Sequence, residues 1–143
     1  MPSKPKVYFF YQNVQISLSN RSGLKKFIES VFRHERKSLA SINYIFVSDK
    51  ALLEINKQFL NHDFYTDIIT FDLSEAEDII AEIYISIDRV RDNAKALRTS
   101  FKSEIHRVIF HGALHLCGFG DKTKGEKAEM REKEDFYLLK YFK

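Results

Sequence analysis

The chain has 143 residues, of which 44% are hydrophobic and 30% are charged, with a formal net charge of +3. This composition excludes an intrinsically disordered chain, and the length predicts one domain spanning residues 1–143. Because no apolar run approaches the roughly 20 residues of a membrane span, we expect neither a membrane segment nor a signal peptide. Cys117 is the one cysteine, which excludes an internal disulfide and fits a reducing, cytoplasmic compartment.

Hydrophobic periodicity predicts strands and helices that are intermixed along the chain. In chain order the predicted elements are a strand at 7–11, a helix over 24–32, a strand at 42–47, a helix over 49–59, strands at 68–73 and 79–87, and three helices that begin near Asp88, near residue 103 and after Thr123. Helices separate the first strand from the second and the second from the third, which indicates that part of the sheet is parallel. We therefore expect an α+β fold, close to α/β, with a mixed four-stranded sheet and about five helices.

Local signals mark the ends of three of these helices. Asn20 or Ser22 can cap the N-terminus of the first helix. Thr123 and Glu126 have the spacing of a capping box before the last helix. Gly118 stands where a C′ residue would end the helix that begins near residue 103.

The densest cluster of candidate functional residues is the stretch His111-Gly-Ala-Leu-His115-Leu-Cys-Gly118-Phe-Gly-Asp121. His111 and His115 are four residues apart on a predicted helix, so their imidazoles share one face and can bind a common metal ion, as in zincins. Gly118 lets the chain turn back, which makes Asp121 a candidate third ligand. Three protein ligands leave one coordination position open, which is typical of a catalytic metal site with a nucleophilic bound water.

Two observations limit this interpretation. Histidines at this spacing also occur by chance on helices that bind no metal. Cys117 is not a candidate ligand, because it lies off the face of the two histidines and is expected to be a small core residue. Zincin proteases place a glutamate base directly after the first histidine, whereas this chain has Gly112 there, which argues against a peptidase. We expect this glycine to open space beside the metal for a substrate.

Two further segments are candidates for a binding surface. The polar stretch 61–67, which contains Thr66 and Asp67, can line a cleft, although its residue types equally suit a helix cap and turn. Arg91, Lys95 and Arg98 are spaced to share a face of the helix that begins near Asp88. That face can contact phosphates or form a solvated surface.

Three stretches of the chain resemble the YbeY family, bacterial endoribonucleases of rRNA maturation. The family signature H-G-x-L-H-L-x-G-x-D-H is matched from His111 through Gly118. The stretch Thr66-Asp-Ile-Ile-Thr-Phe71 is similar to a second family motif, and the stretch Ala81-Glu-Ile-Tyr-Ile-Ser-Ile-Asp-Arg-Val90 is similar to a third. The resemblance covers the chain from about residue 40 to its end.

This resemblance implies a metal-dependent enzyme that cleaves single-stranded RNA. It implies a mixed four-stranded sheet and one Zn²⁺ per chain, with His111 and His115 as ligands and His115 in the catalytic centre. The implied partner is the 16S rRNA precursor of the small ribosomal subunit, with roles in 3′-end maturation and ribosome quality control in the cytoplasm. The predicted RNA contacts are Arg91, Lys95, Arg98, Thr66 and Asp67.

The chain departs from the family pattern at two places. Asp121 occupies the position of the third histidine, and we interpret it as the substitute ligand because a carboxylate suits zinc. An alignment shifted by one residue instead puts Lys122 at the histidine position and predicts a weak two-ligand site. Leu60 stands where the family usually has an arginine, so Arg91, Lys95 or Lys57 would have to supply that charge.

Two other functions remain open from the sequence. One is a ribosome-associated binding factor without catalytic activity, in which the metal only stabilises the fold. The other is a metal-dependent hydrolase of a different substrate.

Overall fold

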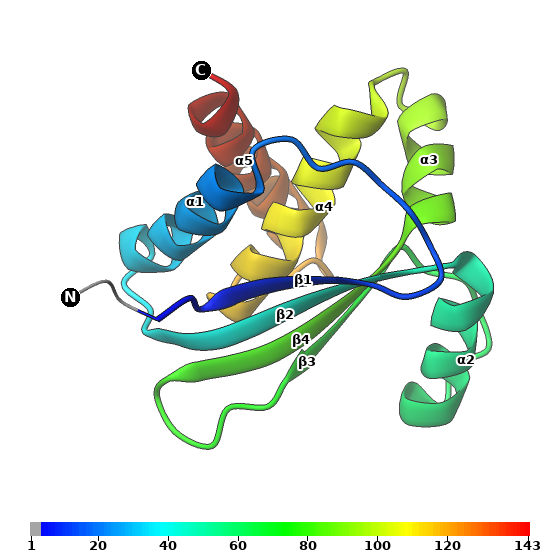
Figure 1. Cartoon of the computed structure of the whole chain (residues 1–143), viewed down its shortest axis with the longest axis horizontal. Coiled ribbons are helices and arrows are strands. Elements are labelled where there is room, and N and C mark those ends of the chain that lie inside the picture. The colour runs from blue at the N-terminus through cyan, green and yellow to red at the C-terminus, as the bar shows by residue number, and fades with distance from the viewer. Residues whose placement is uncertain (1–3) are drawn as a thin grey trace.

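The computed structural model describes residues 4–143 and contains one four-stranded sheet (Figure 1). Its strands are β1 (Val7–Tyr11), β2 (Leu39–Val47), β3 (Ile68–Asp72) and β4 (Ile79–Ser86). The spatial order is β1-β2-β4-β3; β1, β2 and β4 run parallel, and β3 is antiparallel to β4. The predicted mixed four-stranded sheet is therefore confirmed.

The five helices are α1 (Arg21–His34), α2 (Asp49–Leu60), α3 (Ile87–Ala96), α4 (Phe101–Leu116) and α5 (Lys124–Phe142). Helices α1, α4 and α5 lie over one face of the sheet, and the main hydrophobic core fills the space between them (Figure 1). Helix α2 lies on the other side, where Leu52 packs with Ile45, Val47 and Ile69 in a smaller cluster. Within residues 4–143, no helix covers the rest of that face, where large side chains such as Phe10 and Ile80 are exposed.

The predicted helix ends are largely confirmed. Of the two candidate caps for α1, Asn20 is the one whose side chain accepts a hydrogen bond, from the backbone N–H of Gly23. Thr123 and Glu126 form the capping box of α5. Gly118 has φ +106° and donates to the His115 carbonyl, while the Phe119 N–H donates to the Leu114 carbonyl. Together these two bonds form a Schellman motif that ends α4.

Some element boundaries differ from the predicted ones. Strand β2 begins at Leu39 rather than at residue 42, because Leu39 pairs with Ile79 at the start of β4. Helix α4 begins at Phe101, slightly before residue 103, and its cap is Ser100, which with Thr99 is a start signal in the sequence. Leu97, whose spacing from Val90 and Ala94 predicts a buried side chain, is 49% exposed because α3 ends at Ala96.

Gly112 corrects one prediction from the sequence. It opens no space beside the candidate metal ligands but faces the sheet, where an added Cβ would lie 2.7 Å from Ile83 Cδ1 and 3.0 Å from Ile68 Cδ1. The absence of a side chain lets α4 approach β3 and β4 closely. That approach holds the histidine-bearing helix against the rigid sheet.

Between residues 4 and 143, none of the helices combines the length and apolar character needed to cross a membrane.

Candidate functional site

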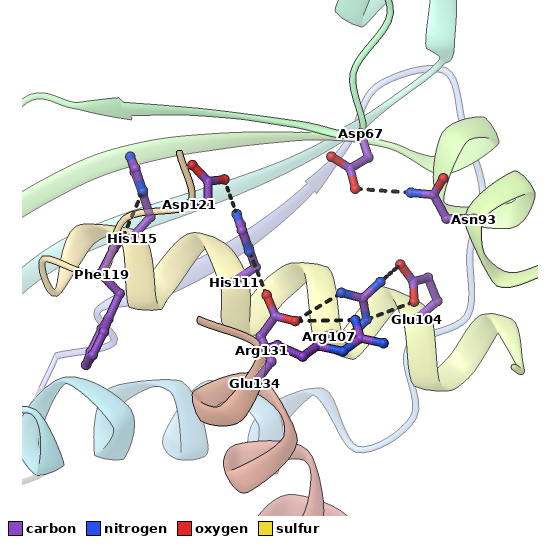
Figure 2. A network of polar contacts seen from close by, with 10 residues as sticks. All are labelled: Asp67, Asn93, Glu104, Arg107, His111, His115, Phe119, Asp121, Arg131 and Glu134. Carbon is purple, nitrogen blue, oxygen red and sulfur yellow. Dashed lines mark hydrogen bonds and ion pairs between the residues drawn. The ribbon is translucent and has the colours of Figure 1, made fainter. Parts of the chain in front are cut away.

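Helix α4 carries the polar side chains of the candidate site on one face. Arg107, His111 and His115 follow one another at four-residue intervals, so each lies about one turn beyond the last. After the Schellman turn at Gly118 the chain doubles back, and Asp121 Oδ2 comes within 3.3 Å of His111 Nε2. The two imidazoles and the Asp121 carboxylate rise on the same side of α4 (Figure 2).

Both histidines are oriented through the same ring nitrogen. His111 Nδ1 lies 2.7 Å from Glu134 Oε2, and His115 Nδ1 lies 3.1 Å from the carbonyl oxygen of Phe119 (Figure 2). An Nδ1–H that donates to such an acceptor leaves Nε2 with a lone pair, which is the usual arrangement of a metal-binding imidazole. The two Nε2 atoms are therefore the candidate donors.

A buried ion network lies beneath His111. Glu134 Oε1 accepts a hydrogen bond from Arg107 Nη1 at 3.0 Å, and the same guanidinium pairs with Glu104. Both carboxylates are almost fully buried. Burial alone would raise the pKa of Glu134, but hydrogen bonds from His111 and Arg107 outweigh it and lower that pKa. Burial lowers the pKa of His111, and the contacts with Glu134 and Asp121 reverse this and raise it.

These side chains border a pocket of about 350 Å³ between the edge of the sheet and helices α4 and α5. Its lining residues are Thr66, Asp67 and Ile68 at the start of β3; Arg107, Val108 and His111 of α4; Asp121; and Lys127, Arg131 and Glu134 of α5. The pocket therefore brings together parts of the chain that are far apart in sequence. His115 does not line it and lies one turn further along α4 (Figure 2).

Asp67 is held on the pocket wall by two elements. Its carbonyl accepts a hydrogen bond from the Ser86 N–H at 2.9 Å, which continues the β3–β4 pairing. Its carboxylate accepts one from Asn93 Nδ2 of α3 at 3.1 Å (Figure 2). Burial raises the pKa of Asp67, and the charge of His111 opposes this only in part. Asp67 is thus a positioned carboxylate that faces His111 across the pocket.

The donor set can be tested for its fit to a metal. No three histidine, cysteine, aspartate or glutamate side chains of residues 4–143 are grouped tightly enough to enclose an ion. His111 Nε2 and Asp121 Oδ2 are nevertheless 3.3 Å apart. Two ligands about 2.1 Å from a tetrahedral zinc would be separated by about 3.4 Å. This spacing makes His111 and Asp121 chemically suited to share a metal, and the Nδ1 contact of His115 leaves its Nε2 with a lone pair as a further donor.

The basic face predicted from the sequence lies outside this pocket. Arg91 and Lys95 are exposed on α3, and Arg91 packs over the Phe101 ring at 5.3 Å. Arg98 is exposed in the turn after α3, with φ 56°. None of the three lines the pocket beside His111, whereas Thr66 and Asp67 do.

The segment 61–67 combines both roles considered from the sequence. Asn61 caps α2 in the left-handed conformation, and the buried Asn56 donates to the Phe64 carbonyl at 2.8 Å. The end of the segment supplies two pocket residues. Leu60 and Lys57 of α2 do not line the pocket, and Lys57 pairs instead with Asp63 at 3.6 Å. Cys117 is buried in the main core, as predicted.

Four polar residues of the site were missed by sequence reasoning: Asn93, Lys127, Arg131 and Glu134. Arg107, a further polar residue of the pocket, has a signal in the sequence, because it precedes His111 by four residues and therefore shares its helix face. The four missed residues come from α3 and α5, and only the tertiary packing of these helices brings them to the site.

Comparison with known proteins gives consistent matches. A family model described as Endoribonuclease YbeY matches residues 9–142. A protein of that name from Cytophaga hutchinsonii is 48% identical over 133 residues, covering 92% of this chain and 93% of the relative. Another from Parabacteroides distasonis is 41% identical over 129 residues, covering 90% and 91%. A solution structure from Thermotoga maritima superposes with a TM-score of 0.65 at 29% identity, covering 96% of this chain and 88% of that one.

Proposed function

This chain belongs to the endoribonuclease YbeY family, and from that premise we propose that it is a metal-dependent endoribonuclease that cleaves single-stranded RNA. The proposed substrate is the 3′ end of the 16S rRNA precursor in the small ribosomal subunit, in the cytoplasm. The proposed catalytic centre is the pocket that joins β3, α4 and α5 together with His115, which lies one turn further along α4.

We propose Zn²⁺ as the metal, one per chain, with His111, His115 and Asp121 as its ligands. Two imidazoles and one carboxylate form a donor set that zinc prefers, and three protein ligands leave one position for water or substrate. A zinc ion bound there would lower the pKa of a bound water and polarise a phosphoryl oxygen. The observation that carries this proposal is the shared orientation of the two rings, whose Nδ1 atoms both face an acceptor.

The residues around the proposed ligands have separate tasks in this reaction. Glu134 fixes the ring plane of His111 through its hydrogen bond to Nδ1, and Arg107 fixes Glu134 in turn. Asp67 faces the same pocket and is placed to orient the attacking water and accept its proton, which its raised pKa favours. Thr66 adds a hydroxyl to the same wall.

The direct test is cleavage of a labelled single-stranded RNA by the purified protein, with and without a chelator. We expect cleavage that stops on chelation and returns with zinc, and no cleavage by a His115→Ala variant purified in parallel. Equal cleavage by that variant would identify a contaminating ribonuclease and overturn the proposal. Intact RNA with the metal-loaded parent would favour a binding factor in which metal removal only lowers the melting temperature.

A further inference from the structure

We propose that Lys127 and Arg131 of α5 bind successive phosphates of the RNA strand beside the metal site. This inference rests on the proposed function and names the side chains that hold its substrate. Both residues line the pocket that contains His111, Asp121 and Asp67. They are four residues apart on one helix, so they lie about one turn from each other on the same face.

Lys127 is unpaired among residues 4–143 and Arg131 is only weakly paired, unlike the third cation in the pocket. Arg107 is only 18% exposed and is held by Glu104 and Glu134, so its donors are occupied within the fold. The Arg131 side chain is 51% exposed, and its one ion pair among residues 4–143 is the long contact from Nη1 to Glu134 Oε1, at 3.9 Å. The Glu134 carboxylate already serves Arg107 and His111. Figure 2 shows Arg131 joined to this network through Glu134.

Lys127 lies at the exposed end of the same face. Among residues 4–143, no carboxylate lies within salt-bridge distance of its ammonium group. The opposite wall of the pocket carries the carboxylate of Asp67, which repels a phosphate. The sugar-phosphate backbone should therefore follow the α5 side of the pocket, and a scissile phosphate would lie between α5 and the proposed metal ligands.

Arg91 and Lys95 of α3 provide a matched comparison. They are also a basic pair four residues apart on an exposed helix face, but they do not line the pocket. The variants Lys127→Ala/Arg131→Ala and Arg91→Ala/Lys95→Ala therefore remove the same charge from the molecule. All four side chains are exposed, so we expect both variants to keep the melting temperature of the parent.

The test measures binding of a 2′-O-methyl oligouridine strand by the metal-loaded protein across a salt series. Each lost single-strand phosphate contact reduces the magnitude of the negative slope of log K against log salt by about 0.7. The slope of the α5 variant should therefore be shallower than that of the parent by about 1.4. The α3 variant should keep the parent slope, because neither Arg91 nor Lys95 lines the pocket, in contrast to the expectation from the sequence that they contact RNA. In cleavage of RNA, the α5 variant should raise KM more than it lowers kcat, and Lys127→Arg/Arg131→Lys should retain binding.

An α5 variant with the parent slope and the parent KM would overturn the inference, as would equal losses in the α5 and α3 variants. The binding readout separates this inference from the proposed function. A parent that cleaves no RNA, but whose salt slope depends on Lys127 and Arg131, would contradict the proposed function and support the phosphate contacts.

Discussion

At the scale of single residues, Glu134 connects the stability of the fold to the chemistry of the pocket. Its carboxylate binds His111 through one oxygen and Arg107 through the other, and its side chain is 3% exposed. A buried carboxylate is costly unless it is paired, so Arg107 makes its burial possible. The same pairing holds the acceptor rigidly behind the His111 ring. Glu134 is thus a positioning residue for a proposed metal ligand.

Replacing Glu134 should weaken metal binding although it contacts no metal itself. Loss of such a partner typically lowers metal affinity about 10- to 100-fold, and we expect this range for Glu134→Ala, measured by competition with a zinc chelator. Glu134→Gln, which retains an oxygen acceptor, should lose less. Glu132→Ala, on the same helix but outside the pocket, is the control. Parent-like zinc affinity in Glu134→Ala would refute the positioning role.

At the scale of elements, the contact between α4 and the sheet depends on Gly112. Its neighbour Ile83 is fully buried and has little room to move away from an added Cβ. Gly125, at the start of α5, has no atom within 4 Å of its added Cβ. The two glycines therefore provide opposite tests of helix packing.

We expect Gly112→Ala to destabilise the protein and Gly125→Ala to stabilise it. Alanine gains up to about 1 kcal/mol of helix propensity at either place, whereas overpacking at residue 112 costs about 1–3 kcal/mol. Thermal or denaturant unfolding of both variants measures the difference. A Gly112→Ala protein as stable as Gly125→Ala would show that α4 has room to retreat from the sheet.

A second contact between elements ties the end of α1 to α5. Glu35 accepts hydrogen bonds from the Tyr137 hydroxyl and from Lys133 Nζ, the latter at 3.1 Å. Burial raises the pKa of Glu35, but these two partners outweigh it and lower the pKa below its ordinary value of 4.5. A carboxyl with a lowered folded-state pKa stabilises the fold above its unfolded pKa, and this contribution is lost as the pH falls through the folded-state pKa.

Glu35→Gln should therefore be less stable than the parent at neutral pH, by about 1 kcal/mol. The difference should shrink as the pH falls below 4.5, the ordinary pKa of this carboxyl. Urea unfolding of both proteins at several pH values measures this convergence. Glu29→Gln on the same helix should match the parent throughout. A gap between Glu35→Gln and the parent that persists unchanged into acid would contradict the tether.

The same elements show what sequence patterns can and cannot predict. Local signals predict the helices correctly. Examples are the apolar period of α1, the capping box at Thr123 and the glycine at the end of α4. The start of β2 depends on pairing with Ile79, and the exposure of Leu97 depends on where α3 stops against α4. Such boundaries are set by tertiary contacts that periodicity does not contain.

At the scale of the whole molecule, the mixed sheet gathers the pocket from three regions of the chain. Because β3 runs antiparallel to β4, its first residues lie beside the end of β4, where Asp67 is held by Ser86 and Asn93. Helix α4 packs against that edge strand, and α5 contributes Lys127, Arg131 and Glu134 to the pocket lining. The sequence therefore predicted the local cluster around His111, whereas the cations of α5 became visible only through the assembled layers.

In this member of the endoribonuclease family, we propose that His111, His115 and Asp121 together form a metal site. The most direct test is the metal content of the purified, zinc-treated parent beside Asp121→Ala and Lys122→Ala variants. We predict about one zinc per chain in the parent and in Lys122→Ala, and far less in Asp121→Ala. Equal metal in all three proteins would move the third ligand elsewhere, and no metal in any of them would contradict the site itself.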